Sequence, residues 1–164
     1  MALFILCTDA LTRKIIENKS IKGITFQKIN FKITQFADDT TFDFQNENDI
    51  KYIMDELKAF EKVSGLKINP EKTQILVSDS LLKTKIQEKF PMFKIENKLK
   101  ILGINFYTQQ KNGMNNWLDK MSIIREIVQD HEKRTLTIFG KIQIIKTLII
   151  PLIIHIARIF IPSE

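Results

Sequence analysis

The stretch KITQFADDTTFDF, residues 32–44, alternates apolar and polar residues as a β-strand does, yet two adjacent aspartates stand at its centre. If Asp38 and Asp39 form a two-residue turn, the flanking residues pair as a hairpin in which Ile33 faces Phe44. In that register three apolar side chains share one face of the hairpin: Ile33, Phe42 and Phe44. The pattern therefore predicts a β-hairpin with two carboxylates at its tip.

Helical periodicity surrounds this hairpin on both sides. Apolar residues recur at helical spacing in residues 3–17, and NKSIKG predicts a turn that ends at Gly23. The same spacing recurs after the hairpin, where Gly65 predicts the helix end and Asn48 or Asp49 its N-cap. The apolar stripe of this second helix comprises Ile50, Ile53, Met54, Leu57 and Phe60.

Strand-like patterning returns further along the chain. Residues 66–77 predict two strands joined by a turn at Pro70, and residues 98–106 predict a strand pair or one bent strand around Gly103. A lysine-rich helix is expected between them, near residues 81–90.

Beyond TQQKNGMNN the pattern is helical only. Three helices are expected: one striped by Trp117, Met121, Ile124, Ile127 and Val128, a second from Leu136 to Ile150, and a third from Pro151 to Phe160. The change of character near residues 107–115 predicts two parts, a mixed α/β layer in residues 1–110 and a helical module in residues 111–164.

The last of these segments, residues 144–161, is rich in isoleucine. Lys146 and Arg158 leave only TLIIPLIIHIA uninterrupted, which is well short of the roughly 20 residues that a membrane-spanning helix needs. The sequence therefore favours a buried helical hairpin with a break or kink at Pro151, and no membrane partner.

Composition narrows the class of protein. A chain of 164 residues with 44% apolar residues is long enough for one substantial core. The single cysteine, Cys7, excludes an internal disulfide and a cysteine-rich zinc site, which favours an intracellular location in the cytoplasm, the nucleus or both. The net charge of +6 favours a polyanionic partner.

The adjacent carboxylates suggest a metal site. Like charges side by side repel each other, and a shared cation removes that repulsion. Mg²⁺ prefers oxygen ligands and is typically held by one or two carboxylates together with substrate phosphates. In two-metal phosphoryl transfer, a pair of such ions about 4 Å apart activates the attacking hydroxyl and stabilises the leaving phosphate. A solvent-exposed Asp-Asp turn without a ligand is the alternative.

Four segments in a fixed order give this pair a context: FADD, then SGLKINPEKTQIL, then LKILGINF, then RTLTIFGKIQIIKTLIIP. Together they resemble the reverse transcriptase family, most closely the enzymes of LINE-type non-LTR retrotransposons. The resemblance covers nearly the whole chain. It implies an α+β fold, with a partial polymerase palm of antiparallel strands and packed helices, followed by an all-helical thumb.

The resemblance also implies roles for single residues. Phe36-Ala37-Asp38-Asp39 matches the family's aromatic-Ala-Asp-Asp box, so Asp38 and Asp39 would be catalytic and would bind Mg²⁺, two ions in the complete enzyme. Lys72 matches a lysine near the incoming triphosphate, where a cation would offset the charge that develops on pyrophosphate. A solvated turn lysine is the competing interpretation of Lys72.

Two further segments would bind nucleic acid. Leu102 and Gly103 match the Leu-Gly pair of the segment that grips the primer terminus, where glycine permits a close backbone approach. The helical end resembles the thumb, on which four basic residues would face phosphates without reading sequence: Lys133, Arg134, Lys141 and Lys146. The implied partners are an RNA template, a DNA primer, deoxynucleoside triphosphates and the remainder of the polymerase polypeptide.

The chain departs from the family pattern at its start. The family's first catalytic aspartate and the fingers, which precede the matching segment, have no counterpart here. The resemblance thus implies a C-terminal palm and thumb fragment that is inactive alone. Two alternatives stay open: a non-catalytic nucleic-acid-binding remnant, and a helical interaction protein that uses its isoleucine-rich end. Group II intron maturases share the box, so the type of element is open too.

Overall fold

The computed structural model describes residues 2–108 and 112–160. By its contacts the chain divides into a first unit, Met1–Ile75 with Asp79–Ile95, and a second unit, Leu76–Ser78 with Glu96–Glu164. The boundary expected between residues 110 and 111 lies outside the described residues. The assignment of residues 1–110 and 111–164 to two domains therefore stays a prediction.

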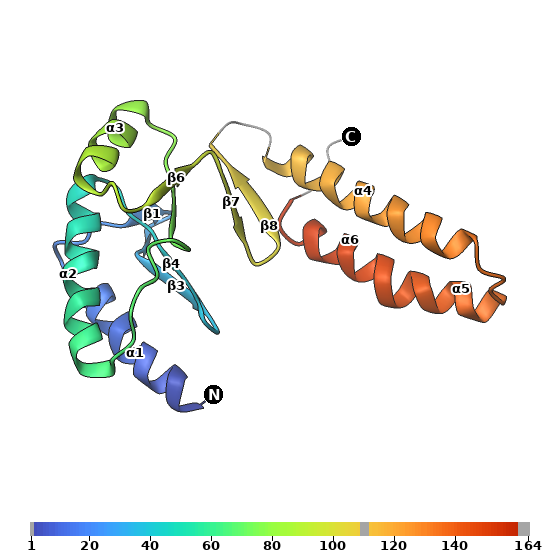
Figure 1. Ribbon diagram of the computed structural model, residues 1–164, viewed down its shortest axis with the longest axis horizontal. Coiled ribbons are helices and arrows are strands. Elements are labelled where there is room, and N and C mark those ends of the chain that lie inside the picture. The colour runs from blue at the N-terminus through green and yellow to red at the C-terminus, as the bar shows by residue number, and fades with distance from the viewer. Residues whose placement is uncertain (1, 109–111, 161–164) are drawn as a thin grey trace. The chain divides into compact units, whose positions relative to one another are not determined.

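The first unit combines helices with short strand pairs (Figure 1). Its helices are α1 (Ala2–Glu17), α2 (Glu47–Ser64) and α3 (Ser80–Lys89). Its strands pair in sequence order: β1 (Ile24–Phe26) with β2 (Ile29–Phe31), β3 (Ile33–Phe36) with β4 (Asp39–Phe42), and β5 (Gln74–Leu76) with β6 (Lys94–Glu96). The α+β class is confirmed, and so are the predicted helices of this unit.

The core of the first unit lies between α1, α2 and the β3–β4 hairpin. Four residues form its buried centre: Leu11, Ile15, Ile21 and Ile53. The predicted apolar face of the hairpin packs against this centre through Ile33, Phe42 and Phe44. Two residues of the α2 stripe, Leu57 and Phe60, pack against it as well. Burial of apolar surface contributes roughly 25 cal/mol per Å² to stability. Because one face of the hairpin is buried in this way, the core also fixes the orientation of the hairpin.

Helix α2 ends where the sequence predicts, but its N-cap differs. Gly65 ends the helix with φ +73°, in the left-handed region. Asn46, not Asn48 or Asp49, is the N-cap, and its side chain accepts hydrogen bonds from the backbone N–H groups of those two residues. Asp49 is buried instead, where its carboxylate accepts the N–H groups of Lys22 and Gln45.

The prediction of two strands in residues 66–77 is wrong for the first of them. Only β5 forms, and it pairs with β6. Around Pro70 the carbonyl of Asn69 accepts hydrogen bonds from the N–H groups of Lys72 and Thr73 and from the Thr73 hydroxyl. These local bonds make a compact turn and leave no strand for β5 to fold back on.

The second unit begins with a hairpin of β7 (Lys98–Ile101) and β8 (Ile104–Tyr107), which decides in favour of the strand pair. The side chain of Asn116, on α4 (Asn112–Glu132), holds this hairpin. Its Oδ1 accepts the Asn105 N–H at 2.8 Å and its Nδ2 donates to the Asn105 carbonyl at 2.6 Å. Asn116 is 1% exposed, so its amide substitutes for a neighbouring strand.

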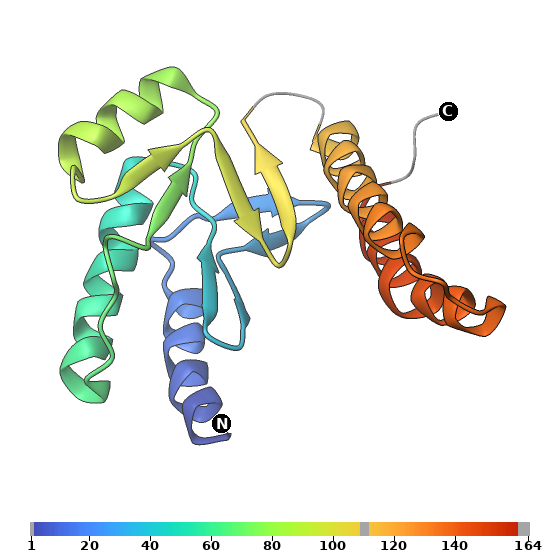
Figure 2. The ribbon, with the colours of Figure 1, turned by 45° about the vertical axis from the view of Figure 1, so that its right-hand side comes forward.

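The two expected C-terminal helices are one continuous helix. It consists of α5 (Ile138–Ile144), a π-helical turn (Ile145–Ile149) and α6 (Ile150–Ala157), and it runs back along α4 (Figures 1 and 2). Pro151 lacks an N–H and its ring crowds the carbonyl four residues back. The π turn, closed by the Ile150 N–H on the Ile145 carbonyl, accommodates the proline without breaking the helix.

The expected burial of this segment is also wrong. Because the helix continues through Pro151, Ile138–Ala157 forms 20 helical residues, and an 18-residue window within it has a mean hydropathy of 1.6 and no buried residue. Ile156, near the end of the helix, is the exception, since its side chain is 0% exposed. By length and composition alone, this helix is able to cross a membrane. A single helix of this kind is weak support for a membrane protein, and the absence of a membrane partner stays a prediction.

Gly23 tests how tightly the loop after α1 packs. A Cβ there would lie 2.2 Å from the Phe31 carbonyl oxygen, and its φ of +63° is left-handed. Gly65 has φ +73° with nothing within 4 Å. Gly65→Ala should therefore cost only the conformational strain, about 1 kcal/mol of unfolding free energy, whereas Gly23→Ala should cost about 3 kcal/mol. Equal losses in urea denaturation would contradict the close packing.

Candidate active site

The tip of the β3–β4 hairpin is the candidate active site. Phe36 pairs with Asp39 and Ile33 with Phe42, so the two central turn residues are Ala37 and Asp38. The predicted register, with Ile33 opposite Phe44, is therefore wrong by two residues. A shift of two keeps every side chain on its face, which is why the predicted apolar face is nevertheless the observed one.

The turn itself is strained. Ala37 has φ +54°, and no other residue of the turn has a positive φ. A single positive φ at the first central position is typical of a type II′ turn, a position that favours glycine. Alanine there costs of order 1 kcal/mol, which the packing at the base of the hairpin must offset.

Polar contacts tie the middle of the hairpin to α1. The Gln35 side chain lies 3.4 Å from the Thr40 hydroxyl across the strand pair. Its Oε1 is 2.6 Å from the hydroxyl of Thr12 on α1. In Figure 2 the hairpin runs beside α1, and its turn points toward the N-terminal half of that helix. The tip is thus an extension of a fixed base.

Asp38 and Asp39 are both exposed at this tip. Asp38 is a turn residue and Asp39 is the first residue of β4, so strand pairing fixes the backbone of the second more firmly. Two exposed carboxylate groups suit a hydrated Mg²⁺, which takes few protein ligands. Within residues 2–108 and 112–160, no cluster of three or more His, Cys, Asp or Glu side chains could hold a metal ion. The pair fits a metal as part of a ligand set.

Asp43, the first residue after β4, carries the next carboxyl along the chain and differs from the pair. Its backbone N–H donates to the Lys32 carbonyl at 2.9 Å, at the base of the hairpin. Burial raises the pKa of Asp43 above its ordinary value of 3.8, because a buried site disfavours the charged form. Desolvation rather than a neighbouring carboxylate causes this shift, so Asp43 is no electrostatic member of the tip.

Lys72 lies in the Asn69–Thr73 turn and is exposed. No hydrogen bond or ion pair in the described part of the chain joins it to Asp38 or Asp39. The backbone bonds of this turn hold its N–H, so only its side chain is free to reach a ligand. The predicted role of Lys72 stays a prediction.

Leu102 and Gly103 form the two-residue turn of the β7–β8 hairpin, with φ +48° and +81°. Positive φ at both positions is typical of a type I′ turn, whose tight shape brings the backbone to the surface. Leu102 is 45% exposed, and a Cβ on Gly103 would meet only the His155 ring at 3.5 Å. The structure therefore explains the Leu-Gly pair by local turn geometry; its contact with a primer stays a prediction.

The four basic residues expected to contact phosphates are all exposed. Lys133 and Arg134 lie between α4 and α5, Lys141 lies on α5, and Lys146 lies in the π turn. Within the described residues none of their side chains makes a hydrogen bond or an ion pair. Their charges are thus available to a polyanion.

Sequence patterns did not single out the residues that hold the two hairpins. Thr12 and Gln35 meet from different elements, and Asn116 lies near the start of α4, next to Asn115 and before the apolar stripe that begins at Trp117. The burial of Asn116, which makes hydrogen-bond partners necessary, is a property of the structure that the polar sequence around it does not reveal.

Comparison with known families places this site in context. The family model described as "Reverse transcriptase (RNA-dependent DNA polymerase)" matches residues 1–106 of the chain. The match includes the β3–β4 hairpin with its Asp38-Asp39 tip, and the β7–β8 hairpin up to Phe106.

The strained turn predicts that an alanine-to-glycine substitution changes stability in opposite directions at two positions of the chain. Ala37→Gly should stabilise the chain by about 0.5 kcal/mol, since relief of about 1 kcal/mol of strain outweighs the added entropy of the unfolded chain. The control Ala59→Gly, at an exposed position of α2, should destabilise it by about 1 kcal/mol. Urea denaturation measures both changes. A loss of stability in Ala37→Gly would contradict the turn geometry.

Proposed function

Because the chain belongs to the reverse transcriptase family, we propose that it is the palm and thumb segment of a LINE-type retrotransposon polymerase. In the complete enzyme this segment takes part in template-directed nucleotidyl transfer onto a DNA primer. The observation that carries the proposal is the pair of exposed carboxylates at the tip of an anchored hairpin, inside the matched residues 1–106. The order of the later motifs supports the LINE type.

In this proposal Asp38 and Asp39 hold Mg²⁺ at the hairpin tip. Held there, the metal would supply a lowered pKa at the attacking primer hydroxyl and balance the charge on the leaving pyrophosphate. The contribution of the rest of the chain is to hold these two carboxylates in position. The core beneath Ile33 and Phe42 and the Thr12–Gln35 contact fix the base of the hairpin, so the carboxylates do not have to be ordered when substrate binds.

Other residues bind the substrates. The exposed side chain of Lys72 contacts the triphosphate and offsets charge as pyrophosphate departs. The tight turn at Leu102 and Gly103 lies against the primer, held from behind by Asn116. Lys133, Arg134, Lys141 and Lys146 bind the phosphates of the template and primer duplex without reading its sequence. We place this reaction in the cytoplasm, the nucleus or both.

The isolated chain is inactive in this proposal. Two carboxylates on one tip leave most of the coordination of two metal ions to other groups, and the remainder of the polymerase polypeptide supplies them. Alignment of the metal ions with the primer hydroxyl accounts for most of the barrier reduction in such reactions, so a partial site gives binding without chemistry.

Exposure of the C-terminal helix favours a second candidate function, that of a helical interaction protein. Phe139 is 85% and Ile138 is 76% exposed, although both are large and apolar. Contiguous surfaces of this kind mark interaction sites. A third candidate, a non-catalytic nucleic-acid-binding remnant, rests on the exposed basic residues alone.

Primer extension tests the proposal. Purified residues 1–164, mixed with an RNA template, a DNA primer, all four nucleotides and Mg²⁺, should bind the duplex at low salt and extend no primer. Loss of duplex binding should follow a rise in salt, because counterion release drives the contact. Robust Mg²⁺-dependent extension that Asp38→Asn abolishes would refute the inactivity. Failure to bind any duplex at low salt would refute the polymerase assignment.

A further inference from the structure

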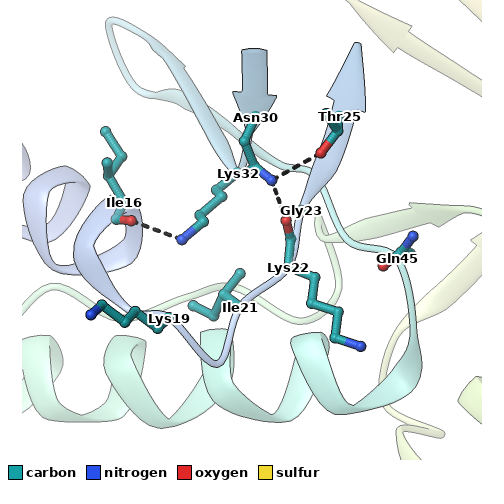
Figure 3. A pocket seen from close by; sticks show the side chains of 9 residues that line it. All are labelled: Ile16, Lys19, Ile21, Lys22, Gly23, Thr25, Asn30, Lys32 and Gln45. Carbon is teal, nitrogen blue, oxygen red and sulfur yellow. Dashed lines mark hydrogen bonds between the residues drawn. The ribbon is translucent and has the colours of Figure 1, made fainter. Parts of the chain in front are cut away.

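A cavity of about 530 Å³ opens at the C-terminal end of α1, at the base of the hairpin rather than at its tip (Figure 3). Nine residues line it: Ile16, Lys19, Ile21, Lys22, Gly23, Thr25, Asn30, Lys32 and Gln45. Three of these are lysines and none is acidic. The lining of the cavity is therefore positively charged. Two of its lysines lie in NKSIKG, which the sequence predicts only as a turn.

The polar wall of the cavity is already ordered. Thr25 and Asn30 face each other across the β1–β2 pair, and Asn30 donates to the Thr25 hydroxyl at 3.1 Å and to the Lys22 carbonyl at 2.6 Å. These bonds fix the loop that carries Lys22 against the β1–β2 strand pair. Gly23, buried with φ +63°, permits the close approach of that loop to β2.

The three lysines differ in what they do. Lys32 Nζ donates to the carbonyls of Ile16 and Asn18, both at 2.8 Å, and so caps the C-terminal end of α1. Lys19 and Lys22 are exposed, and within the described residues their ammonium groups make no hydrogen bond or ion pair. Lys32 is structural, whereas Lys19 and Lys22 are free to bind a ligand.

Their arrangement indicates an extended anion. Figure 3 shows Lys19 and Lys22 on either side of Ile21, directed away from each other. Both also line a neighbouring depression together with Ser20, Asn46 and Tyr52, among others. Two ammonium groups that point in different directions suit successive phosphates of a strand better than one small anion.

An acidic residue, Asp49, lines the neighbouring depression but does not fully cancel the positive charge of Lys19 and Lys22. Asp49 lines that depression, yet it is 1% exposed and its two oxygens accept the N–H groups of Lys22 and Gln45. Its charge is thus shared with the backbone amides, and Lys19 and Lys22 keep the exposed positions.

We propose that Lys19 and Lys22 bind successive phosphates of a single nucleic-acid strand across the cavity at the C-terminal end of α1. The choice of nucleic acid rests on the proposed function. The larger cavity, across which the strand would run, is lined by no aromatic side chain, and Tyr52 lines only the neighbouring depression. The contact across the larger cavity is therefore to the backbone and carries no sequence preference. This site is additional to the basic residues of the second unit.

Paired substitutions test the site in the full chain. Lys19→Gln with Lys22→Gln removes two charges at the cavity, and the control Lys58→Gln with Lys62→Gln removes two exposed charges from α2 that line neither depression. The probe is a fluorescent oligothymidylate of about 15 nucleotides, titrated at several salt concentrations. The cavity pair should reduce the slope of log K against log salt by about 1.4, from two contacts at about 0.7 each. The control pair should leave it within error.

Three outcomes would overturn the site. Equal slopes for the two double variants would show that only net charge matters, and would leave the proposed function standing. No oligonucleotide binding by the unaltered chain at low salt would remove the proposed function as well. The third outcome is a titration with inorganic phosphate at matched ionic strength. If phosphate saturates the amide chemical shifts of Gly23 and Thr25 and the oligonucleotide does not, the cavity binds a small anion instead.

Discussion

Apolar packing at the base of the β3–β4 hairpin is the interaction on which the candidate site depends. Ile33, Phe42 and Phe44 pack against a buried centre contributed by α1, α2 and the loop between α1 and β1. This packing stabilises the hairpin and determines which way its tip points. A strained alanine and two adjacent, mutually repelling carboxylates are tolerated at the tip because the base is held independently of them.

Local patterns in the sequence predicted most elements but not how they meet. The α2 stripe and Gly65 are signals within one stretch of chain, and both were right. The register of the hairpin was wrong because registers two residues apart put the same side chains on each face. The turn offers no glycine to decide between them. The placement of the carboxylates at the tip could be predicted, whereas the Thr12–Gln35 contact and the Lys19–Lys22 cavity could not, since each joins separate elements.

The C-terminal helix shows the same limit from another side. Proline predicts a break when the surrounding backbone is a regular α-helix, yet one π turn absorbs it here and lengthens the apolar segment to 20 residues. The burial expected from composition was wrong because α4 covers only part of this helix.

In each unit a polar side chain also satisfies backbone groups that apolar packing cannot satisfy. Asn116 holds β8 through its amide, and Lys32 caps the C-terminal end of α1.

Metal binding by the hairpin tip is the central claim, and Mn²⁺ tests it directly as a paramagnetic substitute for Mg²⁺. Substoichiometric Mn²⁺ should broaden the amide resonances of residues 37–40 before all others. Asp38→Asn with Asp39→Asn should abolish this selectivity, while Asp55→Asn, an exposed acidic position on α2, should leave it intact. Broadening near Asp55 that equals broadening at the tip in the unaltered chain would contradict the claim.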